Sequence, residues 1–73
     1  MNSHYSMVIQ WSEADQLFLV HLPDFPSQQF VTHGITYEAA ARNGQEVLAM
    51  IIEEYTEEGK VLPEPQILRG QAA

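Results

Sequence analysis

Apolar residues recur at helical spacing between Gly34 and Gly59, the longest periodic stretch of the chain. At about 100° per residue, this spacing predicts one long helix with a buried stripe and an opposite, solvated stripe. The buried stripe consists of Tyr37, Ala40, Gly44, Val47, Leu48, Ile51 and Tyr55, and the solvated stripe of Arg42, Glu46, Ala49, Glu53 and Glu57. Thr36 suits the N-cap, and Gly59 suits the left-handed position that ends a helix. Gly44, in the middle of the buried stripe, predicts a close approach of the helix to a sheet.

The segment before the helix has the period of two that is typical of strands. Alternate positions of Tyr5–Trp11 are apolar, and the apolar run Leu17–Leu22 follows after a short polar loop. Together they predict a hairpin in which Ser12 pairs with Leu17. The pairs beneath the helix are then Trp11 with Phe18, Ile9 with Val20, and Met7 with Leu22. A slip of one residue would destroy this match.

The chain then returns to the helix through a turn and a short strand. Pro23–Ser27 holds two prolines that fix the backbone of a rigid turn. Gln29–Thr32 alternates weakly and predicts a third strand, followed by a bend at His33 and Gly34. After Gly59, prolines allow at most an edge strand or an irregular arm. We therefore expect an α+β fold, β-β-β-α-β, with three antiparallel strands, a short edge strand and one helix on one face.

The sheet face turned away from the helix is expected to be too apolar for a surface in water. It carries Val8, Leu17 and Leu19 beside Ser6, Gln10 and His21. A chain of this length is also near the size at which a single core is marginal. We expect Val8, Leu17, Leu19 and His21 to form the interface of a homo-oligomer, most simply a two-fold dimer.

A difference in length points the same way. A helix over residues 36–58 is about 34 Å long, whereas strands of six or seven residues span about 20 Å. One end of the helix therefore overhangs the sheet and needs either the tail or another subunit against it. The alternative to a dimer is that Val61–Leu68 folds back and covers the exposed apolar surface within one chain.

Composition excludes several classes of function. The 73 residues form one expected domain, 1–73, with an ordered core of about 4–68, and carry a formal charge of −7. This charge disfavours binding to nucleic acids and anionic membranes and suits a basic protein partner. The chain has no cysteine, no signal-peptide pattern at its start and no apolar run long enough to cross a bilayer. We expect a soluble, cytoplasmic protein.

The residues that carry chemistry are scattered. His4, His21 and His33 fall in a terminus, a strand and a loop, without the spacing of a metal site. No phosphate-binding loop or nucleophile-bearing turn is present. The two hairpin strands contain no carboxylate, so they lack the converging acids of a two-metal hydrolase. The sequence predicts no catalytic, metal or cofactor site, and a protein that is not an enzyme.

Six short motifs follow one another at a characteristic spacing. They are a strand starting at Tyr5, PDFP at Pro23–Pro26, T-x-G-x-T at Thr32–Thr36, E-x-A at Glu38–Ala40 with Asn43, E-x-G at Glu57–Gly59, and P-E-P at Pro63–Pro65. In this order the chain resembles the HicB-like family, the antitoxin component of HicA/HicB toxin–antitoxin pairs. The chain differs from the family pattern at Ser27-Gln28, Ile35 and Ala39. Because it stops at Ala73, the C-terminal DNA-binding module of many members is not expected.

The resemblance implies a partial RNase H-like fold that binds and occludes a small basic mRNA-cleaving HicA-type toxin. On this interpretation the acidic side chains Asp24, Glu46, Glu53 and Glu57 are the expected partner-binding residues, acting mainly on the rate of encounter. No cofactor is implied. The alternative is a solitary HicB-like module without a toxin, acting as a homo-oligomeric structural or regulatory protein.

Overall fold

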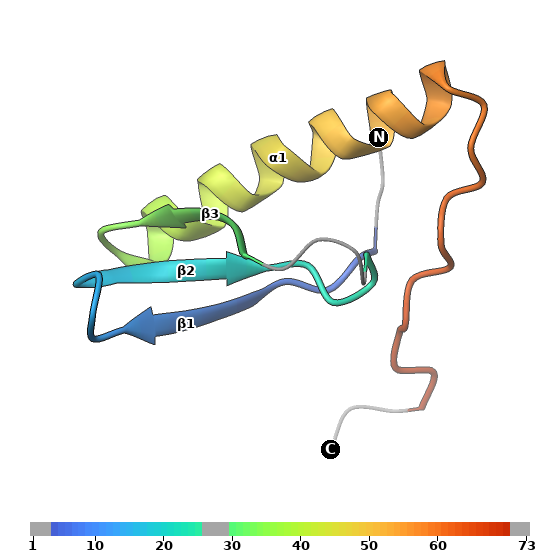
Figure 1. Cartoon of the computed structure of the whole chain (residues 1–73). Helices are drawn as coiled ribbons and strands as arrows, with labels where there is room; N and C mark the ends of the chain where they lie inside the picture. Colours follow the sequence, from blue (N-terminus) through green and yellow to red (C-terminus); the bar gives the residue numbers. More distant parts are fainter. Residues whose placement is uncertain (1–3, 26–29, 71–73) are drawn as a thin grey trace.

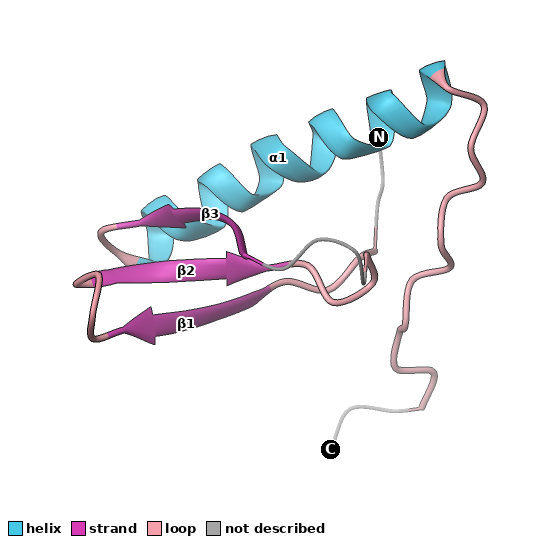
Figure 2. Cartoon of the chain, viewed as in Figure 1, coloured by secondary structure: helices cyan, strands magenta, loops and turns pink. Residues whose placement is uncertain are grey.

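A computed structural model describes residues 4–25 and 30–70 of the chain. Its elements follow one another in the order β1 (Val8–Ser12), β2 (Leu17–His21), β3 (Phe30–Gly34) and α1 (Tyr37–Glu57). The strands form an antiparallel sheet in the order β1-β2-β3, and α1 lies across one face of it (Figures 1 and 2). The predicted α+β class, with three antiparallel strands and one helix, is confirmed.

The register of the first hairpin is the one that the apolar pattern predicts, but the strands are shorter than expected. Their pairing starts at Val8 and His21, so β1 does not begin at Tyr5 and the predicted pair of Met7 with Leu22 is not part of the ladder. Ser12 pairs with Leu17, Trp11 with Phe18, and Ile9 with Val20. Val20 has no exposed surface and lies beneath the helix. The register is strongly specified because a slip of one residue would move Val20 and its neighbours to the opposite face.

The third strand differs from its prediction. It continues through His33 and Gly34, which were expected to form a bend, because Leu19 and Phe18 of β2 pair with them. Gln29, the predicted start of this strand, lies outside the described residues. Gly34 is required at the end of β3, since a Cβ there would lie 2.3 Å from the backbone nitrogen of Ala40.

Both ends of α1 are capped as predicted. The Thr36 hydroxyl oxygen accepts a hydrogen bond of 3.0 Å from the Ala39 backbone N–H. At the other end Gly59 has φ of +69°, and the Lys60 N–H donates to the Tyr55 carbonyl at 2.9 Å. The left-handed glycine turns the chain so that the following N–H can bond to a carbonyl of the last helical turn, which would otherwise lack a partner.

The buried stripe of the helix is confirmed in its centre and wrong at its start. Gly44 touches the sheet, because a Cβ at this position would lie 2.8 Å from Met7 and 3.0 Å from Val20. Tyr37, predicted to be buried, is 67% exposed, because it sits in the first turn of the helix, where the Phe18 ring lies against one side of it. Ile52 is buried although it was not assigned to the stripe.

The core has a second part beyond the end of the sheet. Leu48, Ile51 and Ile52 of α1 form one cluster with Leu22 and Phe25, and Tyr5 and Leu62 pack at its edge. Phe25 is fully buried, with its ring centroid 4.9 Å from that of Tyr5 and 5.7 Å from that of Tyr55. The turn after β2 thus covers the overhanging half of the helix.

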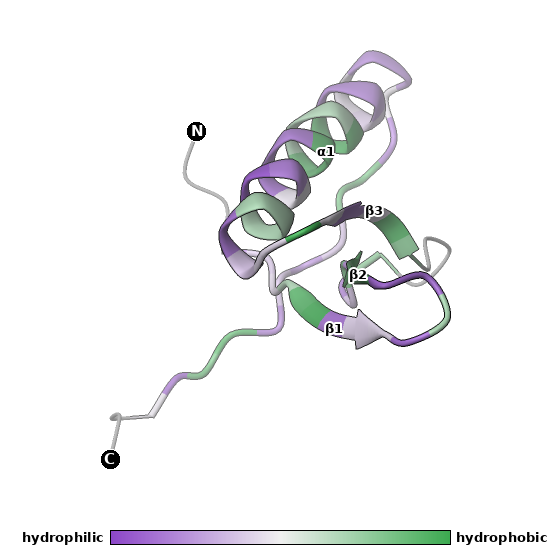
Figure 3. Cartoon of the chain, turned by 90° about the vertical axis from the view of Figure 1, so that its left-hand side faces the viewer, coloured by the Kyte–Doolittle hydropathy of each residue, from purple (hydrophilic) through white to green (hydrophobic). Residues whose placement is uncertain are grey.

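The expected fourth strand does not form within residues 60–70. These residues make an irregular arm that runs past the end of the sheet and away from the helix (Figures 1 and 3). Pro63 and Pro65 cannot donate to a strand ladder, which accounts for the difference. The arm covers part of the helix through Leu62, but Val61 and Leu68 are almost fully exposed. It therefore does not fold back over all the exposed apolar surface.

Replacement of Gly44 by leucine tests the contact between helix and sheet. We expect Gly44→Leu to lower the free energy of unfolding by about 1–3 kcal/mol, since the new side chain has to displace Met7 and Val20. Ala49→Leu is the matched control, because Ala49 is exposed on the same helix, and it should change stability by less than about 0.5 kcal/mol. Denaturant melts of both variants measure the difference. Equal losses would mean that the helix rests on the sheet by another face.

Candidate functional site

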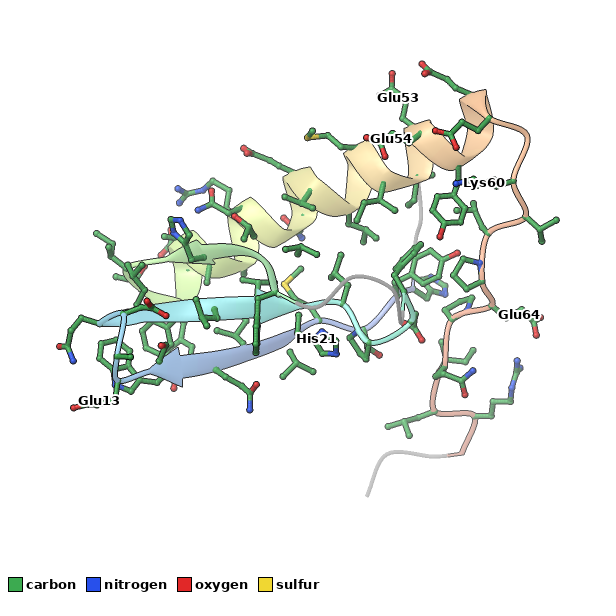
Figure 4. All side chains as sticks on the ribbon, in the orientation of Figure 1. Glu13, His21, Glu53, Glu54, Lys60 and Glu64 are labelled. Atoms are coloured by element: carbon green, nitrogen blue, oxygen red, sulfur yellow. The ribbon has the colours of Figure 1, made fainter. Side chains whose placement is uncertain are left out.

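The outer side of α1 presents a row of acids, which we call the acidic helix face. It consists of the acids Glu46, Glu53 and Glu57 and of Met50, which lies between them. Their spacing places all four on one side of the helix. All four are exposed, and Met50, Glu53, Glu54 and Glu57 line a shallow hollow of about 220 Å³. Figure 4 shows Glu53 on this side, pointing away from the sheet.

The charges on this face are not neutralised within the chain. In the described part of the molecule, Arg42 pairs with Glu38 at 3.3 Å and Lys60 with Glu58 at 3.0 Å. Neither cation pairs with Glu46, Glu53 or Glu57. The structure therefore brings together three of the four predicted partner-binding acids, and adds Met50. The predictions did not include this residue, although its spacing of four from Glu46 and three from Glu53 places it in the same row.

Asp24, the fourth predicted partner-binding acid, lies elsewhere and is only 7% exposed. One carboxylate oxygen accepts a hydrogen bond of 2.8 Å from the Ser6 N–H, and the other accepts one of 3.0 Å from the Gln66 N–H. The side chain thus fastens the turn after β2 to both ends of the described chain. Its burial and its two bonds leave it no exposed charge with which to steer a partner, so the structure does not support that role.

A second hydrogen bond near Asp24 joins the N-terminal segment to the arm. The Tyr5 hydroxyl donates a hydrogen bond of 2.6 Å to the carbonyl of Pro63 in the arm. Burial raises the pKa of Tyr5, and the nearby negative charge of Asp24 raises it further. The tyrosine therefore stays protonated and able to donate throughout the neutral range.

The sheet face opposite the helix holds the predicted interface residues. The pairs Val8–His21, Gln10–Leu19 and Ser12–Leu17 place these side chains on one surface, which we call the open sheet face. Figure 3 shows α1 on the other side of the sheet. Phe30 belongs to the same surface, since it pairs with His21, and it is 54% exposed. The predicted interface did not include Phe30, because a bulge in β2–β3 pairing decides which face its side chain occupies.

The open sheet face carries no carboxylate or ammonium group. Its described positions are Val8, Gln10, Ser12, Leu17, Leu19, His21, Phe30 and His33. The described acids lie instead in the hairpin loop, the turn after β2, the helix and the arm. The molecule therefore has one charged and one uncharged exposed surface, on opposite sides.

Chemistry that needs converging ligands has no visible site in residues 4–25 and 30–70. No group of three or more histidine, aspartate or glutamate side chains there is arranged to hold a metal ion. No helix of this part is long and apolar enough to cross a membrane.

The chain was compared with models of protein families, with curated proteins and with solved structures, and none of the three comparisons finds a match. What the fold and the surfaces define is therefore a class, a small α+β protein with one helix on a three-stranded antiparallel sheet.

Proposed function

We propose that this chain is a non-catalytic binding protein of the antitoxin type, which neutralises a small basic mRNA-cleaving protein by covering its active site. The observation that carries the proposal is the acidic helix face, with three exposed glutamates that no cation of the described chain neutralises. The resemblance to HicB-like antitoxins supports it. The order β-β-β-α agrees with the first four elements expected of that family's partial RNase H-like fold.

The physical chemistry of the face suits this role. Exposed charges of one sign raise the rate at which an oppositely charged partner is encountered, even where they add little to the final affinity. Met50, 60% exposed in the middle of the row, offers a flexible apolar contact once the partner has arrived. Because such a toxin acts on mRNA, we place the protein in the cytoplasm.

A pair of matched charge reversals tests this function. Glu53→Lys should slow association with a small basic toxin of the HicA type several-fold at low salt, because it reverses a charge in the middle of the acidic face. Glu64→Lys makes the same change of net charge on the exposed arm and should have a much smaller effect. Surface plasmon resonance at rising salt concentrations measures both rates. Equal effects of the two variants, or rates that do not depend on salt, would refute the role of this face.

The open sheet face favours a second candidate, a solitary homo-oligomeric module without a toxin. An uncharged face with Val8, Leu17, Leu19 and Phe30 allows two copies of a chain of charge −7 to meet without opposing their acids. A two-fold dimer would bury the same residues from both copies. This assembly is compatible with either function, because the acidic helix face lies on the opposite side.

Light scattering tests the dimer directly. The wild type is expected to have the mass of a dimer at tens of micromolar protein, and Leu19→Lys that of a monomer, since it places a charge in the centre of the buried face. Val61→Lys is the control, because Val61 is almost fully exposed on the arm, away from the face. A monomeric wild type would end the dimer proposal. A dimer that survives Leu19→Lys would place the interface elsewhere.

A further inference from the structure

Three aromatic rings form a continuous cluster at the hairpin end of the molecule. The Trp11 and Phe18 rings meet edge to face with centroids 5.1 Å apart, and the Phe18 and Tyr37 rings lie 4.3 Å apart. They come from β1, β2 and the first turn of α1, which converge there (Figure 1). We call Trp11, Phe18 and Tyr37 the aromatic ledge.

The ledge is more exposed than a structural cluster needs to be. Trp11 is 48% exposed and Tyr37 67%, while Phe18 lies half-buried between them. Ile35, two residues before Tyr37, is 76% exposed. Large apolar groups gathered at one place on a small protein mark an interaction surface, and tryptophan and tyrosine are the residues that most often dominate binding at such surfaces.

Acidic residues lie close to these rings in the sequence, and one of them contacts a ring. Glu13 accepts a hydrogen bond of 2.6 Å from the Trp11 indole N–H and is itself exposed at the hairpin tip (Figure 4). Asp15 follows in the same loop, and Glu38 is the neighbour of Tyr37. The ion pair between Glu38 and Arg42 joins two highly exposed side chains. Because water screens the two charges, the attraction between them is weak.

We propose that the aromatic ledge binds an arginine or lysine side chain of a basic protein partner. The cation would rest against the exposed rings of Trp11 and Tyr37, with the hairpin carboxylates beside it. Aromatic faces attract cations electrostatically, and adjacent negative charges strengthen this preference. The proposal rests on the proposed function for its choice of a basic protein, and it adds a contact site distinct from the acidic helix face.

Trp11 is the only tryptophan of the chain, so its fluorescence reports on this site alone. A blocked peptide of alternating arginine and glycine should change the Trp11 emission saturably. The same peptide with citrulline in place of arginine, uncharged but of nearly the same shape, should not. Tyr37→Leu keeps an apolar side chain but removes the ring, and should weaken arginine-peptide binding roughly two- to five-fold. Leu68→Ala, which shortens an exposed apolar side chain on the arm, should leave it unchanged.

Several results would overturn the proposal. An equal response to the citrulline peptide would mean a general apolar patch, and an emission that depends on protein concentration without peptide would mean that a second copy covers the ledge. Absence of saturation, or an unchanged affinity in Tyr37→Leu, would also refute it. The titration needs no toxin, so peptide binding without toxin binding defeats only the proposed function. Toxin binding that Tyr37→Leu leaves intact, without peptide binding, defeats only the ledge.

Discussion

The part of the molecule beyond the end of the sheet, which we call the far half, depends on the hydrogen bonds of the Asp24 carboxylate. A buried charge is stable only if it is hydrogen-bonded, and here the two donors are the backbone amides of Ser6 and Gln66. Hydrogen bonds to charged groups contribute about 1.5–3 kcal/mol each, a large share of the stability of a small domain. Because the two donors come from opposite ends of the described chain, this one side chain closes the fold.

The need for such a closure follows from the lengths of the elements. A helix of 21 residues lies on strands of five, so it extends well past the sheet. Gly44 permits the first half of the helix to rest directly on the strands, and Phe25 packs against the second half. With one sheet face taken by the helix, the open sheet face, the acidic helix face and the aromatic ledge remain as exposed surfaces. The proposed binding functions use these three surfaces.

The sequence predicted the parts of the fold that depend on local patterns. Helix caps at Thr36 and Gly59 and the hairpin register at Ser12–Leu17 follow from spacing and side-chain chemistry, and the structure has them. The burial of Asp24 did not follow, because it depends on Ser6 and Gln66, which are distant in sequence. The exposure of Tyr37 depends on where the strands end beneath the helix, which periodicity alone does not specify. Pro63 and Pro65 indicated either an edge strand or an irregular arm. Which of the two forms depends on whether a neighbouring strand pairs with these residues.

The candidate surfaces were predicted less completely than the fold. The spacing of the helix acids predicted that they lie in one row. The alternation of the hairpin residues predicted which apolar side chains share one face of the sheet. Phe30 and the cluster of Trp11, Phe18 and Tyr37 required the relative placement of three elements. Pairing with β2 puts Phe30 on the open sheet face, and the start of α1 brings Tyr37 against the hairpin. Such juxtapositions come from tertiary structure, for which a single sequence holds no local signal.

Amide hydrogen exchange, followed by NMR in the wild type and in Asp24→Ala, tests the role of this closure most directly. The Ser6 and Gln66 amides should lose their protection in Asp24→Ala. Helix residues 48–57 should also lose more protection than residues 40–46, which rest on the sheet. Asp15→Ala, which removes an exposed hairpin carboxylate instead, should leave both halves unchanged. Unaltered protection in Asp24→Ala, or an equal loss along the whole helix, would contradict the claim that Asp24 holds the far half together.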